Sequence, residues 1–177
     1  GLKSILEDIE NVNTTVIGDT VTTYENMNLA HYSNSGNFND VIEVNGNSNY
    51  IETRGGNDTI NVDGNQNGTI DAGEGNNRID IDGNAGTIYV GNNDDSIRIG
   101  SNANSSIDLR EGTNIIDVLG NSNSIYSGSG NDTIIVDGSV NGVISSGYGA
   151  DRIDIGGNVS GMIDSNDGDD VVTIGGT

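Results

Sequence analysis

A ladder of isoleucine and valine residues, 18 or 19 residues apart, limits what this chain can fold into more than any other feature. One series of anchors consists of Ile42, Ile60, Ile79, Ile97, Ile116, Ile134, Ile153 and Val172. A second series lies between them, at Ile51, Ile70, Ile88, Ile107, Ile125, Ile144 and Ile163. Around the anchors, apolar or small residues alternate with polar ones, which is typical of a short strand with one buried face. Each repeat therefore contains two strands.

Two short strands in each repeat predict an all-β fold, a parallel β-solenoid whose coils stack about 4.8 Å apart. We expect about eight coils over residues 36–177, with Ile60, Ile79 and Ile97 directly above one another. A helical repeat does not fit, because the alternation has a period of two. A three-sided hexapeptide helix does not fit either, because the anchors lie 9 or 10 residues apart.

The first 35 residues do not continue the ladder, and we assign residues 1–35 to an N-terminal cap and an irregular first coil. The apolar residues of segment 2–9 share one helical face, which predicts a short capping helix or the remnant of an upstream domain. Residues 23–38 are expected to form an irregular loop that exposes His31. The ladder stops in mid-pattern at Thr177, which favours either a longer chain or end-to-end stacking of subunits.

The charge balance restricts the partners. The chain has 27 acidic and 6 basic residues and a net charge of −21, which argues against nucleic acid and against anionic membrane surfaces. It contains no Cys, which excludes disulfides and thiolate zinc sites, and no apolar stretch is long enough for membrane insertion. Cations are the expected partners of such a chain.

The two kinds of turn differ in sequence. The return turn from the first anchor series to the second has Gly followed by Asn in most repeats, as in Gly64-Asn65 and Gly83-Asn84. Both residue types tolerate the positive φ of a tight reversal, and stacked Asn side chains can hydrogen-bond along the rod. We interpret this row as structural. The extra residue in some return turns indicates a bulge.

The opposite turn always takes nine residues between anchors and is rich in Gly and Asp, as in SGSGNDTI (127–134) and SGYGADRI (146–153). These segments resemble the nonapeptide G-G-x-G-x-D-x-U-x of the RTX family of exported proteins, where U is a large apolar residue. The whole coil 127–145 is similar to the 19-residue calcium-bound repeats of bacterial RTX adhesins. The resemblance covers roughly residues 36–177.

The resemblance implies that turn carbonyls and the Asp carboxylate bind calcium between successive coils. Calcium prefers six to eight oxygen ligands in flexible geometry, and stacked Asp side chains would repel one another without a cation. By motif position the candidate carboxylate ligands are Asp40, Asp58, Asp95, Asp132, Asp151 and Asp170. The glycines of the two best-matched turns complete the candidate set, namely Gly128, Gly130, Gly147 and Gly149.

Several turns depart from the motif. Asn77 and Asn114 replace the Asp, and Arg54 and Arg110 occupy a glycine position. Both changes occur in turn 110–114, where we predict no calcium and a guanidinium that stands in as the local cation. The alternative for all of these turns is a metal-free solenoid in which Asp side chains cap turn amides.

Outward strand positions form mixed rows. One row is expected to contain Asp80, Arg98 and Asp117, and another Asp71, Tyr89, Asp108 and Tyr126. The second row is either solvated surface, which we favour, or a stripe that binds sugar or protein. The turn positions used for ice binding in this fold are here too charged and uneven, so ice binding is not expected.

The function predicted from the sequence is a non-catalytic, structural or adhesive module, secreted or at the cell surface and stabilised by calcium. Its expected partners are calcium, further copies of itself, and glycans or proteins of the surface or matrix. The alternative is a metal-free, self-assembling filament subunit. A carbohydrate-binding or polysaccharide-processing β-helix fits less well, because no unique residue cluster breaks the repeat.

Overall fold

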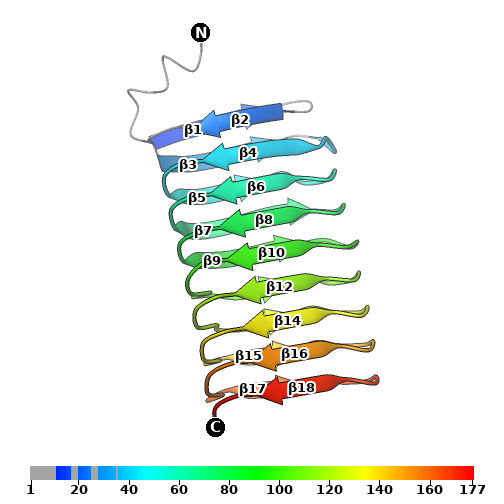
Figure 1. Ribbon diagram of the computed structural model, residues 1–177. Coiled ribbons are helices and arrows are strands. Elements are labelled where there is room, and N and C mark those ends of the chain that lie inside the picture. The colour runs from blue at the N-terminus through cyan, green and yellow to red at the C-terminus, as the bar shows by residue number, and fades with distance from the viewer. Residues whose placement is uncertain (1–10, 17–19, 25–27, 35) are drawn as a thin grey trace.

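The computed structural model describes residues 11–16, 20–24, 28–34 and 36–177, and in these ranges the chain winds into a parallel β-solenoid (Figure 1). Consecutive strands alternate between two sheets, so that every coil adds one strand to each sheet. The helix expected over residues 2–9 lies outside the described residues. Within them, no helix is long and apolar enough to cross a membrane.

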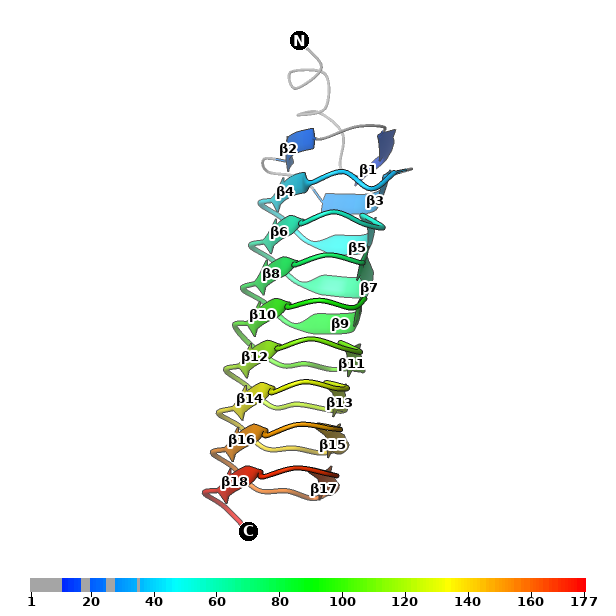
Figure 2. The same ribbon diagram turned by 90° about the vertical axis from the view of Figure 1, so that its right-hand side faces the viewer.

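The two sheets run along two sides of the rod (Figure 2). Sheet A consists of β1 (Asn11–Val16), β3 (Asn28–Asn34), β5 (Ser48–Glu52), β7 (Gln66–Gly73), β9 (Ala85–Val90), β11 (Ile107–Asp108), β13 (Ile125–Tyr126), β15 (Val143–Ser145) and β17 (Met162–Asp164). Sheet B consists of β2 (Thr20–Tyr24), β4 (Asp40–Val44), β6 (Thr59–Val62), β8 (Arg78–Ile81), β10 (Ser96–Ile99), β12 (Ile115–Val118), β14 (Thr133–Val136), β16 (Arg152–Ile155) and β18 (Val171–Ile174).

The strand register confirms the predicted columns. Ile79 pairs with Ile60 on one side and with Ile97 on the other, so these three anchors lie directly above one another in sheet B. In sheet A, Ile88 pairs in the same way with Ile70 and Ile107. Buried and outward residues alternate along the strands β6, β8 and β10 of sheet B, and from the anchor onward in β7 and β9 of sheet A, because the side-chain period of a strand is two.

The core is two stacks of aliphatic side chains in the narrow space between the sheets. Every isoleucine anchor from Ile42 to Ile153 has an exposed fraction of at most 1%. Small inward residues such as Ala72 and Ser127 lie where the sheets approach the turns. Because each coil is held mainly by the coils above and below it, the stability of such a rod is approximately a sum over neighbouring pairs.

The region before residue 36 is more regular than predicted. Residues 28–34, expected within an irregular loop, form strand β3, which pairs with β1 and β5. His31 is part of this strand and stacks on Tyr50 with a ring-centroid distance of 4.8 Å, so its assignment to an exposed loop was wrong. Tyr32 is fully buried and pairs with Ile51. An aromatic residue therefore continues the inner column where the aliphatic ladder stops, which is why the sequence pattern missed the strand.

The return turns from sheet B to sheet A contain the predicted asparagine ladder. The Oδ1 atom of each Asn accepts a hydrogen bond from the backbone N–H at the same position in the next coil; for example, Asn65 N–H donates to Asn47 and Asn84 N–H donates to Asn65, both at 2.8 Å. The ladder therefore joins side chain to backbone. The predicted irregularity from unequal turn lengths is also present, as register shifts between β5 and β7 and between β7 and β9.

Candidate metal-binding turns

The turns from sheet A to sheet B, which we name the acidic turns, bring one buried Asp or Asn from each coil into a single column. These residues directly precede a sheet B strand or, at Asp40, begin it. Seven of them have exposed fractions of at most 3%, namely Asp40, Asp58, Asn77, Asp95, Asn114, Asp132 and Asp151. Asp170, in the last coil, is partly exposed. The six predicted carboxylates thus lie in one column and share it with two asparagines.

One oxygen of each side chain in this column has a structural role. The backbone N–H of Asn114 donates to Asp132 Oδ1 at 2.8 Å, and the N–H of Asp132 donates to Asp151 Oδ1 at 2.8 Å. The same bond, between 2.8 and 3.0 Å, joins every neighbouring pair from residue 40 to residue 170. Asp and Asn serve equally well here, because both offer an acceptor at Oδ1.

The second terminal atom separates the two residue types. In the asparagine coils it is an amide nitrogen that donates to turn carbonyls. Asn77 Nδ2 lies 3.1 Å from Gly73 O and 3.0 Å from Gly75 O, and Asn114 Nδ2 lies 3.2 Å from Ser127 O. These carbonyl oxygens are therefore partnered within the protein.

In the aspartate coils the second atom is an oxygen, which cannot donate to a carbonyl. The Oδ2 atoms of Asp58, Asp95, Asp132 and Asp151 are buried and receive no hydrogen bond of good geometry. The hydroxyls of Thr53 and Ser127 lie near Asp58 and Asp132 and favour their ionised forms, but they donate to the carbonyls of Ala72 and Ser146. A buried acceptor without a partner is destabilising by roughly 1–3 kcal/mol, and by more when it carries charge. The aspartate coils therefore contain a buried carboxylate oxygen without a donor, whereas the asparagine coils, which have the same backbone, do not.

The pKa values of three of these carboxyls are raised by their burial. Removal from water raises the pKa of Asp58 from 3.8 to about 6, although a hydrogen bond from the backbone of Asp40 opposes the rise. The same cause raises the pKa of Asp95 to about 7 and that of Asp132 to about 6. In the absence of a positive partner, ionisation of these carboxyls is therefore less favourable in the folded chain than in water.

The glycines of these turns have positive φ and lie against the preceding coil. Gly130 has a φ of 132° and Gly147 a φ of 85°, and a Cβ at either position would overlap a carbonyl oxygen of the coil before it. Gly128 and Gly149, the other two predicted glycines, share both properties. The backbones of successive turns are therefore in close contact here, which leaves no room for a side chain at these glycines.

The turn 110–114 corrects one hypothesis. The position assigned to the guanidinium of Arg110 is occupied instead by the amide of Asn114, which donates to Ser127 O. Arg110 lines a hollow on the outward face of sheet A together with Asp71. The left-handed backbone of Arg110, with a φ of 62°, matches that of Gly128 in the next coil.

The donor set distinguishes among metals. Nowhere in ranges 11–16, 20–24, 28–34 and 36–177 are three or more His, Cys, Asp or Glu side chains grouped so that they could hold a metal ion. A cation at an acidic turn would therefore meet one buried carboxylate oxygen and otherwise backbone carbonyls. Calcium accepts such ligands, whereas zinc and copper favour nitrogen or sulfur.

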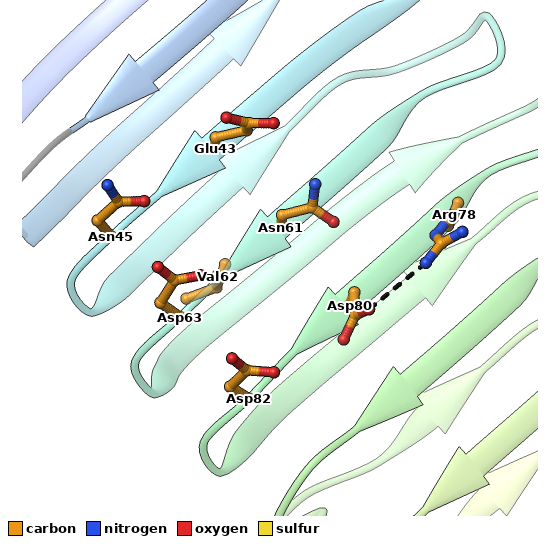
Figure 3. A pocket seen from close by; sticks show the side chains of 8 residues that line it. All are labelled: Glu43, Asn45, Asn61, Val62, Asp63, Arg78, Asp80 and Asp82. Carbon is orange, nitrogen blue, oxygen red and sulfur yellow. Dashed lines mark ion pairs between the residues drawn. The ribbon is translucent and has the colours of Figure 1, made fainter.

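A second acid-rich region lies on the outward face of sheet B (Figure 3). It is a hollow of about 380 Å³ whose lining includes Glu43, Asp63, Asp80 and Asp82. Arg98 contacts Asp80 at 2.8 Å and Asp82 at 3.1 Å, which confirms the predicted proximity of Arg98 and Asp80 in one row. Asp80 and Asp82 pair with arginine, and Glu43 and Asp63 are exposed, so none of these carboxylates is buried without a partner as in the acidic turns.

These features define a class of protein: a parallel β-solenoid with two sheets and one column of buried Asp and Asn residues at its turns. The chain is similar in structure to a hyperactive, Ca²⁺-dependent, β-helical antifreeze protein from an Antarctic bacterium. The TM-score is 0.54 at 23% sequence identity, over 90% of this chain and 75% of that chain. At this identity the likeness supports the fold alone. No family model and no curated protein matches the chain, and membership of the RTX family stays a prediction.

Proposed function

We propose that this chain is a non-catalytic structural module, a β-solenoid stabilised by calcium at its aspartate turns. The observation that carries the proposal is the unpartnered, buried Oδ2 of Asp58, Asp95, Asp132 and Asp151, set against the partnered amide at the same position of Asn77. An ion between that oxygen and the turn carbonyls would satisfy both. The Ca²⁺ dependence in the name of the structurally similar protein supports the choice of metal.

The proposal assigns ions to particular coils. The four coils with unpartnered carboxylate oxygens are the principal sites, with the glycines around Asp132 and Asp151 supplying carbonyl ligands. Asp40 and Asp170 are further candidate ligands near the two ends of the column. The turns of Asn77 and Asn114 hold no ion, because their amides already donate to the carbonyls that an ion would bind.

The decisive experiment is calorimetric titration of the chelated protein with CaCl₂, paired with Asp132→Asn and Asn77→Asp. We expect Asp132→Asn to bind one ion fewer and Asn77→Asp one ion more, each with an unchanged β-sheet circular dichroism spectrum in calcium. A wild-type chain that folds fully in a chelator and takes up no calcium would refute the proposal.

The place of action is part of the proposal. Calcium is scarce inside cells and abundant outside them, so a chain with a net charge of −21 would remain loosely structured before export and fold afterwards. We therefore propose an extracellular or cell-surface location and a role as a spacer or adhesive rod. Localisation of the tagged full-length protein by surface proteolysis tests this, since complete protection in intact cells would contradict it.

Ice binding is not proposed. The outer turn column that contains Gly55 and Glu74 continues through Glu111, Ser129 and Tyr148 to Asp167. Charged and aromatic residues in one column give an uneven surface. Measurement of thermal hysteresis in calcium is expected to give the value of a non-binding control protein.

A further inference from the structure

The outward face of sheet A contains a hollow that the calcium proposal does not use. Its volume is about 300 Å³, within the range of small-ligand sites. It spans three coils, and the lining residues that matter here are Asp71, Gly73, Glu74, Tyr89, Gly91 and Arg110. The side chain of Tyr89 is a wall of this hollow, and the residue is 43% exposed.

The hollow is formed where one row lacks side chains. Gly73 and Gly91 lie next to each other, with Gly91 N–H donating to Gly73 O at 2.7 Å, and Arg110 follows in the next coil. The floor between the larger side chains is therefore bare backbone. An added Cβ at Gly73 would overlap the carbonyl oxygen of Arg54, so this part of the floor cannot easily be filled.

Arg110 shares its left-handed backbone with Arg54 and Asn166 at the same position of other coils, and of these three only Arg110 lines the hollow. Its φ of 62° lies in the left-handed region, which costs a non-glycine residue roughly 1–2 kcal/mol, and the equivalent Gly128 of the next coil avoids this cost. The fold does not need an arginine there. Strain at a residue that lines a hollow is a reason to look for a ligand.

The charges of the lining limit the ligand. Asp71 and Glu74 repel polyanions, and Arg110 repels polycations. Burial raises the pKa of Asp71, and the nearby guanidinium of Arg110 opposes that rise. Carboxylates accept hydrogen bonds and guanidinium donates them, and a sugar hydroxyl group can do both. The exposed face of a tyrosine ring suits the apolar face of a sugar. A neutral, hydroxyl-rich ligand matches this lining best.

The row extends along the rod. Asp71 pairs with Tyr89, Tyr89 with Asp108, and Asp108 with Tyr126, which is 40% exposed. The two tyrosines lie two coils apart, about 10 Å along the rod. This distance is close to two sugar units of an extended β-linked chain. We propose that the hollow and the row from Asp71 to Tyr126 bind a linear, neutral polysaccharide parallel to the rod axis.

The test is native affinity electrophoresis in calcium, with gels that contain hydroxyethyl cellulose, glucomannan or laminarin, and alginate as the polyanion. We expect at least one neutral polysaccharide to retard the wild-type chain. Tyr89→Ala should weaken that binding by about tenfold, the usual effect of losing an anchoring aromatic. Arg110→Gly should weaken it too while preserving the fold, because glycine suits the left-handed backbone.

Tyr148→Ala is the matched control. Tyr148 is 66% exposed but lies in the outer turn column between Ser129 and Asp167, away from the hollow, so this variant should bind like wild type. The proposal is overturned if no neutral polysaccharide retards the wild-type chain, if Tyr89→Ala binds normally, or if Tyr148→Ala loses as much affinity. Retardation by alginate alone would also overturn it. Circular dichroism of every variant in calcium separates loss of binding from loss of fold.

Discussion

Two neighbouring coils, one ending its acidic turn in Asn114 and the next in Asp132, have the same backbone and different chemistry. Both side chains are buried, and both accept a backbone hydrogen bond from the preceding coil at Oδ1. Asn114 Nδ2 then donates to Ser127 O, whereas Asp132 Oδ2 has no partner. Asparagine therefore completes the turn by itself, whereas aspartate leaves an acceptor that the turn does not satisfy.

The largest effect on the stability of the aspartate coils is expected from the removal of calcium. Four buried carboxylates without a cation, at roughly 1–3 kcal/mol each, approach the whole stability of an ordinary domain. At neutral pH we expect a chelator to lower the thermal unfolding midpoint sharply, and excess calcium to restore it. Magnesium is the control, because its strict octahedral geometry should restore less. A chelated chain with unchanged thermal stability would contradict the comparison.

The pH dependence of the metal-free chain should be the next largest effect. The folded-state pKa values of Asp58 and Asp132 are about 6 and that of Asp95 is about 7, all above the ordinary 3.8. Between these limits the folded state binds more protons than the unfolded state, so the free energy of unfolding falls as pH rises from about 4 to about 7. Above pH 7 it should change little.

In calcium the slope should reverse, because the ion binds the ionised carboxylates and competes with protons. Urea denaturation at a series of pH values, with calcium or with chelator, measures both slopes. From these pKa values the expected difference between pH 4 and pH 7 is at most roughly 8 kcal/mol for the metal-free chain. Parallel pH profiles in the two conditions would rule out calcium at these carboxylates.

Replacement of one Asp by Asn should change the free energy of unfolding in opposite directions without and with calcium. Asp132→Asn gives the turn an amide like that of Asn114, so we expect it to stabilise the chelated chain by about 1–3 kcal/mol. In calcium the same variant should be less stable than wild type, because it loses a site. Chemical denaturation in the two conditions measures both differences.

The reverse exchange, Asn77→Asp, supplies the matched control for that variant. Its turn has glycines at 73 and 75, whose carbonyls would become available to an ion. We expect it to destabilise the chelated chain and to stabilise the calcium-loaded one. If either variant shifts stability in the same direction in both conditions, the aspartates have a purely structural role.

Much of the fold could be predicted from the sequence, because repetition makes one pattern visible many times. The step between anchors and the period-two alternation together predicted which residues stack, and the pairing of Ile79 with Ile60 and Ile97 confirms it. Strand β3 was missed because Tyr32 replaces the aliphatic anchor. A single aromatic residue that fills the same column has no periodic signal of its own.

The candidate site was predictable in position and less so in mechanism. Motif position alone identified the column that contains Asp58 and Asp132, but the sequence did not show that one oxygen of each is already used by the backbone of the neighbouring coil. The amide donor of Asn114 was also missed, and the guanidinium of Arg110 was proposed instead as the local cation of that turn. The signal that could have revealed it is that only asparagine replaces aspartate at this position, since it alone keeps the acceptor and adds a donor.

The smallest expected effect concerns acidic residues outside the column. Asp80 pairs with Arg98 on the outward face of sheet B, and such exposed pairs contribute at most about 1 kcal/mol. Asp80→Asn removes one negative charge, as Asp132→Asn does, but from a solvated position. We expect the number of bound calcium ions to be unchanged and the stability to shift by less than about 0.5 kcal/mol. An equal loss of calcium from Asp80→Asn and Asp132→Asn would mean that total charge attracts the ions, whereas a difference would mean that burial of an unpartnered oxygen selects the sites.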